Sequence, residues 1–246
     1  MIESLTAHPH MALDLLSISS LSIKPTLFTQ VPALDTVHDK LASFVDSVAS
    51  LANPSKIKDD LAQEIFPWLK QRYVEKSNAL ASPAVVAAFG RTIADLAANL
   101  PAASMFPLFD VWRLAILEPS IAQATLTPLV KELASNSESI SSSPRATLLT
   151  LQRLTTNALG TPLLARSLLL PTGAQEARGA LTGVLVQTLL HQDRLVRVAA
   201  ASLAFNIGAW VQRGRIARTK GGREEVVDGS GQTKRMGSGR SSLSAP

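Results

Sequence analysis

The chain has 246 residues, of which 46% are hydrophobic, 17% are charged and 4% are aromatic, and its net charge is +5. It has no cysteine, which excludes disulfides, thiolate catalysis and cysteine-based zinc sites. Alanine and leucine are abundant and no long stretch alternates with a period of two, so the composition predicts an all-α protein with enough apolar residues for one core or a repeat array.

The first half of the chain predicts a linker followed by helices. Residues 1–30 have irregular apolar spacing and many Ser and Pro, which indicates an extended arm. Helical spacing begins at Pro32, and that helix ends at Asn53-Pro54, where Ser55 is expected to cap the next one. Pro67 should kink or split this second helix because its ring removes a backbone donor. Ser82-Pro83 is a start signal for a third.

The stretch from Met105 to Pro119 predicts the most deeply buried helix. It has apolar residues on almost every side, so other helices must surround it. It also has one acid and one base, Asp110 and Arg113. A guanidinium on such a helix must find a partner or face a groove. Arg113 could therefore pair with Asp110 or serve a binding site, and both interpretations stay open.

The second half continues the helical pattern. We expect a helix over 121–133 interrupted at Pro128, a loop over 135–143, and helices starting at Pro144, Pro162 and Glu176. Asp193 should cap the last helix, which we expect to end near Arg213. Together these predict about nine helices in an α-solenoid of stacked hairpins, with a compact helical bundle as the alternative.

The excess positive charge lies in the last part of the chain. From Arg213 onward there are eight basic and three acidic residues, and eight minus three accounts for the whole net charge. This Gly/Ser-rich stretch predicts a disordered tail. We therefore divide the chain into an arm (1–30), a helical domain (31–213) and a basic tail (214–246). Non-specific nucleic-acid contact through the tail is the weaker functional alternative.

Enzyme chemistry finds little support in the sequence. The four histidines do not form a metal-ligand pattern, and we find no nucleophile with a base and no phosphate-binding loop. We predict no catalytic residues, no metal and no cofactor. The arginines on apolar helices instead suggest a groove for an acidic peptide or a terminal carboxylate, formed by Arg113, Arg153, Arg194 and Arg197. The simpler alternative is that Arg113 pairs with Asp110 and Arg197 with Asp193.

Three segments carry a family pattern: 106–120 (FPLFDVWRLAILEPS), 147–164 (TLLTLQRLTTNALGTPLL) and 193–210 (DRLVRVAAASLAFNIGAW). In their order and spacing they resemble three helices of the PUL domain, an Armadillo-like module of the phospholipase-activating protein and its fungal relatives. The resemblance places Arg113 in the first segment, Arg153 and Asn157 in the second, and Asn206 in the third. It makes Phe106, Asp110, Trp112, Asn157 and Asn206 the expected structural residues.

The resemblance implies a function and a location. PUL domains bind the C-terminal tail of the AAA ATPase called valosin-containing protein in ubiquitin-dependent protein handling, without catalytic activity. We therefore expect a binding module. No apolar run reaches the roughly 18 residues of a membrane span and the N-terminus is a poor signal peptide, so we expect an intracellular protein without a span, cytoplasmic with the nucleus as a second location. Residues 25–41 are also similar to fungal proteins that join this domain to a thioredoxin-like or PPPDE peptidase domain, so an accessory role there is an alternative.

One departure from the family pattern concerns the end of the domain. The family continues with a further helical pair, and this chain has the basic tail instead. The chain could accordingly be a fragment. Without a covering pair, the last helix should expose an apolar face, and we expect self-association through it.

Overall fold

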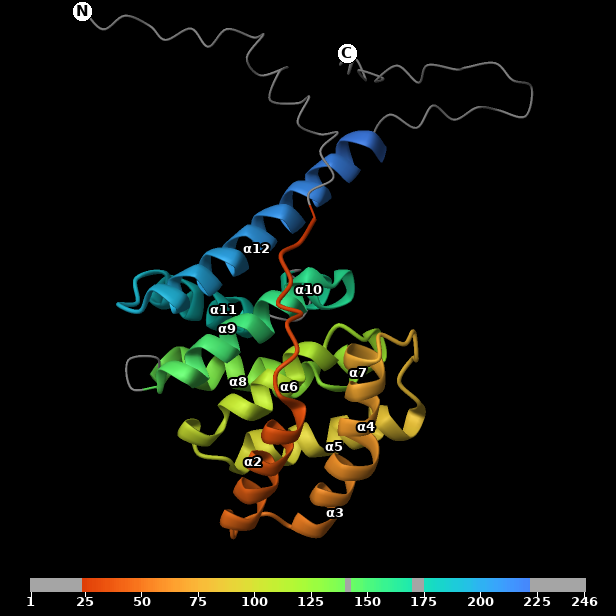
Figure 1. Cartoon of the computed structure of the whole chain (residues 1–246). Helices are drawn as coiled ribbons and strands as arrows, with labels where there is room; N and C mark the ends of the chain where they lie inside the picture. The colour runs from red at the N-terminus through yellow and green to blue at the C-terminus, as the bar shows by residue number, and fades with distance from the viewer. Residues whose placement is uncertain (1–23, 140–142, 170–174, 222–246) are drawn as a thin grey trace, which may run out of the picture. The chain divides into compact units, whose positions relative to one another are not determined.

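The computed structural model describes residues 24–139, 143–169 and 175–221 (Figure 1). The chain forms two units, and the larger one covers Ile23–Trp210. The second consists of Met1–Ser22 and Val211–Pro246, and only its residues 211–221 are described. The predicted N-terminal arm up to residue 23 and the predicted tail from residue 222 therefore lie outside the described residues.

The described residues are helical or irregular, with no strand among them. The helices are α2 (Leu34–Ser47), α3 (Pro54–Asp59), α4 (Phe66–Leu69), α5 (Pro83–Asn99), α6 (Phe106–Ala115), α7 (Pro119–Ala124), α8 (Leu126–Ser139), α9 (Arg145–Gly160), α10 (Pro162–Leu169), α11 (Gln175–Leu189) and α12 (Arg194–Gly221). In the larger unit they pack as a helical solenoid, in which α6 lies along α9 and α8 along α11 (Figure 1). The all-α solenoid that the sequence predicts is confirmed.

Two of the predicted helix caps are confirmed, at Ser82 and Asp193. The Ser82 hydroxyl accepts a hydrogen bond from the Val85 N–H, and Asp193 Oδ1 accepts from the N–H groups of Leu195 and Val196. The predicted cap at Ser55 is wrong. Asn53 caps α3 by accepting from the Lys56 N–H, because Pro54 occupies the first helical position.

The predicted disruption at Pro67 takes the form of wider helical turns. Two π-helical segments, Asp60–Ile65 and Lys70–Val74, flank the short α4 that contains this proline. Because proline has no N–H, the regular hydrogen-bond pattern cannot continue through it, and wider turns accommodate the interruption. Further along, the predicted loop over 135–143 is partly wrong, since α8 continues through Ser139.

Helix α6 is surrounded by other helices, as its apolar sequence predicts. Its residues from Pro107 to Phe109 and from Val111 to Ala115 are buried, including Trp112, which is fully enclosed. The Trp112 indole N–H donates to the Thr125 hydroxyl at 2.9 Å, so its one polar group is satisfied. Phe106 lies at the edge, where the Lys40 ammonium stands 4.8 Å from its ring centroid.

Helix α12 differs from the prediction in length. It continues to Gly221, whereas we expected it to end near Arg213 and the tail to begin there. By length and composition, Arg194–Arg213 could also cross a membrane, with a mean hydropathy of 1.3 and 33% of that window buried. One such helix is weak evidence for a span, since core helices of soluble proteins have the same features.

The last two helices expose large apolar side chains. On α12, Leu195, Val198 and Phe205 are each about half exposed, and on α11 Val186 and Leu189 are also accessible. An apolar face of this kind is what the sequence predicts for the last helix. Self-association through it stays a prediction.

Glu132 on α8 gives the fold a predicted pH dependence. Burial raises its pKa from 4.5 to about 7, against a weaker opposing hydrogen bond from Asn136. The folded state therefore holds the proton more tightly than the unfolded chain, and stability is lost as the pH rises from 4.5 through 7. We expect Glu132→Gln to match the wild type near pH 4 and to melt at a higher temperature at pH 8. If the wild type and Glu132→Gln had the same melting temperature at pH 8 as well as at pH 4, this prediction would be wrong.

Candidate functional site

Residues 24–33, which comprise the described part of the predicted arm and the three residues before α2, run in an extended conformation across α6, α9 and α12, and we call this segment the arm from here on (Figure 1). One buried polar side chain from each of these helices hydrogen-bonds to its main chain. We call these side chains the polar row: Arg113 from α6, Asn157 from α9 and Asn206 from α12. They are 3%, 0% and 1% exposed, so they are almost completely enclosed between the helices and the arm.

Two asparagines hold the arm by the same pair of bonds. The Asn206 carboxamide accepts from the Thr26 N–H at 2.8 Å and donates to the Thr26 carbonyl at 2.9 Å. The Asn157 carboxamide accepts from the Phe28 N–H at 2.7 Å and donates to the Phe28 carbonyl at 3.0 Å. A carboxamide has both a donor and an acceptor, so it satisfies the two main-chain groups of one extended residue.

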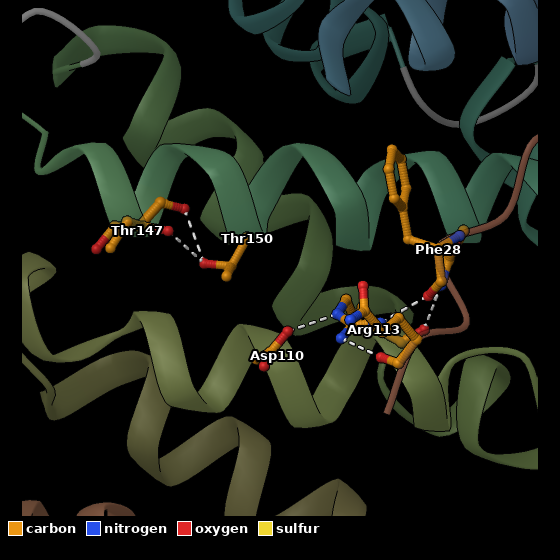
Figure 2. A network of polar contacts seen from close by, with 8 residues as sticks. Phe28, Asp110, Arg113, Thr147 and Thr150 are labelled. Carbon is orange, nitrogen blue, oxygen red and sulfur yellow. Dashed lines mark hydrogen bonds and ion pairs between the residues drawn. The ribbon is translucent and has the colours of Figure 1, made fainter. Parts of the chain in front are cut away.

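The third member of the row binds the arm through its charge. Figure 2 shows Arg113 between the α6 residue Asp110 and the main chain of Phe28. Its Nη1 donates to the Phe28 carbonyl and its Nη2 to the Gln30 carbonyl, both at 2.6 Å, while Nε donates to Asp110 Oδ1 at 2.5 Å. The predicted alternative that Arg113 pairs with Asp110 is therefore confirmed, and each nitrogen of the guanidinium is already bonded within the chain.

The row repeats one arrangement along the solenoid. Asn157 also donates to the Arg113 carbonyl, 44 residues earlier, and Asn206 to the Thr156 carbonyl, 50 residues earlier. Each asparagine thus links its helix to the preceding layer as well as to the arm. The two separations are close to the roughly 40–47 residues of HEAT and Armadillo repeats.

Arg153 lies beside the arm, and no described acidic residue forms an ion pair with it. This α9 residue is half-buried, and its guanidinium carbon is 5.5 Å from the centroid of the Phe28 ring. Its buried Nε has no hydrogen-bond partner among the described residues. Burial lowers the pKa of Arg153, and the Arg113 charge lowers it further against the opposing effect of Asp110. An anion placed here would find a partly desolvated cation.

The other two arginines of the predicted groove lie in the first turn of α12. Both are exposed, and no contact of the described residues joins them to the arm. Arg197 donates to the carbonyls of His191 and Gln192, each at 2.7 Å. Its predicted pairing with Asp193 is wrong, because Asp193 pairs with Arg145 of α9, which lowers the pKa of that carboxyl.

The sequence did not predict that the arm occupies the polar row. The residues that the row binds, Thr26, Phe28 and Gln30, are held through main-chain atoms, so their side-chain types contain little information about the contact. A weak signal was available in Pro25 and Pro32, since a residue before proline favours extended backbone. Asp110, Trp112, Asn157 and Asn206, four of the residues expected to be structural, each make a side-chain hydrogen bond to another part of the chain.

The stacked helical layers place the fold among the helical repeat proteins, whose extended surfaces commonly bind other chains. The family model that matches this chain is the PUL domain, over residues 23–233. The chain belongs to the PUL domain family, and the match includes the described part of the arm. No curated protein and no solved structure matches the chain.

Proposed function

We propose that this protein binds the acidic C-terminal tail of the AAA ATPase valosin-containing protein in ubiquitin-dependent protein turnover, in the cytoplasm and, as a second location, in the nucleus. The observation that carries the proposal is the unpaired, half-buried Arg153 beside an extended main chain. Membership of a family of helical protein-interaction domains supports a binding role without catalysis.

The four arginines of the predicted groove differ in how much each can contribute to binding an acidic peptide. Arg153 has no hydrogen bond among the described residues, so a carboxylate that binds its terminal nitrogens displaces no existing bond. Arg194 and Arg197 are exposed, and exposed ion pairs contribute only about 0–1 kcal/mol. Arg113 already has three intramolecular bonds, so its role is to hold the arm. Arg153 is accordingly the principal binding residue of the predicted groove.

Titration of a fluorescently labelled peptide from the ATPase C-terminus tests the proposal. Arg153→Ala should weaken binding by about 1.5–3 kcal/mol, since a charged hydrogen bond is lost. Arg194→Ala and Arg197→Ala should each have smaller effects that decrease with added salt. Lys131→Ala is the matched control, because it removes one exposed positive charge from α8.

Two outcomes would contradict the proposed function. The first is that the wild type does not bind the peptide. The second is that Arg153→Ala binds as tightly as Lys131→Ala, since the partly desolvated cation would then contribute no more than a distant surface charge.

A further inference from the structure

The arm uses only one of its two edges for hydrogen bonding. The N–H or C=O groups of Thr26, Phe28 and Gln30 bond to the polar row, whereas the main-chain groups of Leu27 and Thr29 have no partner among the described residues. In an extended chain, successive residues direct these groups to opposite sides. The arm is therefore the equivalent of an edge strand. Its inner edge is paired with helices, and its outer edge is open and exposed at Leu27 and Thr29.

The contacts of the arm indicate that it stays in place when a partner binds. Its removal would leave the buried Arg113, Asn157 and Asn206 without the main-chain groups that satisfy them. The arm also fits closely on α9, where Leu27 and Pro25 lie directly over Gly160. Addition of a partner to the open edge keeps all these contacts, whereas displacement of the arm breaks them.

We propose that an extended acidic peptide adds to the arm as a second strand, pairing with the main-chain groups of Leu27 and Thr29 and placing a carboxylate against Arg153. Main-chain pairing of this kind provides affinity, and the adjacent cation provides the selectivity for an acidic partner. The acidity of the partner rests on the proposed function. Pro25 and Pro32 bound the open edge, so only a short peptide segment can pair there.

Removal of one outer N–H group tests the pairing directly. Thr29→Pro deletes a donor that has no partner among the described residues and keeps Phe28 in the extended conformation that it already has. The melting temperature should stay unchanged, while the affinity for a labelled acidic peptide with a free C-terminal carboxylate should fall about five- to tenfold. Thr29→Val is the matched control, because it changes the side chain and retains the N–H.

Methylation of peptide nitrogens provides a second test that does not alter the protein. Two versions of the same peptide are compared, one with N-methyl groups at its odd-numbered residues and one at its even-numbered residues. One version should not bind and the other should bind nearly normally, because only every second N–H of a paired strand faces its neighbour. If both methylated peptides bound equally well or equally poorly, or if the Thr29→Pro protein bound the peptide as tightly as the wild type, the proposed pairing would be overturned and the proposed function would remain. Absence of binding by the wild type would overturn both.

A disulfide between the arm and α9 distinguishes addition from displacement. A Cβ at position 160 would lie 3.6 Å from the Pro25 Cβ, within the range of disulfides, and the chain has no other cysteine. The Pro25→Cys/Gly160→Cys variant requires only that the exposed Leu27 side chain rotate away. The oxidised variant should bind the peptide as tightly as the reduced one. Binding that is lost on oxidation and restored on reduction would show that the peptide displaces the arm.

Discussion

Arg113→Ala is expected to lower the free energy of unfolding by about 3–5 kcal/mol, the usual cost of removing one partner of a buried charged pair. The substitution leaves the carbonyls of Phe28 and Gln30 and the Asp110 carboxylate without the donor that joins them. Arg113→Lys should have a smaller effect, because an ammonium keeps the charge but cannot reproduce the planar fork. Chemical denaturation followed by circular dichroism measures both.

Arg194→Ala is the control for this experiment. It removes an exposed arginine from α12, and such surface changes usually stay within about 0.5 kcal/mol. If Arg113→Ala were as stable as Arg194→Ala, the bonds between α6 and the arm would not contribute to stability, and Arg113 would again be available for a partner.

Asn157→Ala should be the second most damaging change, at roughly 2–4 kcal/mol, because it leaves the Phe28 N–H and the Arg113 carbonyl unpaired at a cost of about 1–3 kcal/mol each, whereas the Phe28 carbonyl keeps its bond from Arg113. The deleted carboxamide is fully buried and bonds to the N–H and carbonyl of Phe28 and to the Arg113 carbonyl. Thermal unfolding measures the loss. The arm should also become sensitive to proteolysis, since its central attachment is gone.

Asn99→Ala is the matched control for the second prediction. Asn99 makes a single exposed hydrogen bond to the Asp95 carbonyl at the end of α5, so its loss should change stability little. A melting temperature for Asn157→Ala equal to that of Asn99→Ala would mean that the polar row does not hold the layers and the arm together.

Much of the fold was predictable because its signals are local. Ser82 and Asp193 mark helix starts through their own side chains, and the apolar residues of α6 require burial whatever surrounds them. The limits of α8 and α12 were harder to predict. Ser135–Ser139 and Gly214–Gly221 have the composition of loops and yet continue the preceding helices.

The sequence predicted which helices form the site, but it did not predict that the arm binds there. The family pattern placed Arg113, Asn157 and Asn206 on three different helices, and these residues form the polar row. The arm binds this row through main-chain atoms, and no side-chain pattern encodes such a contact. The sequence also could not determine the partner of Asp193, because Arg145 reaches it from another helix, 48 residues away.

Amide hydrogen exchange along the arm of the free protein tests the central claim most directly. The N–H groups of Thr26 and Phe28 should exchange slowly, since they donate to Asn206 and Asn157, whereas those of Leu27 and Thr29 should exchange at nearly unprotected rates. This alternation would establish both the paired inner edge and the open outer edge. Uniformly fast exchange at all four residues would show that the arm is not held by the polar row, and uniform protection would show that the outer edge is already paired.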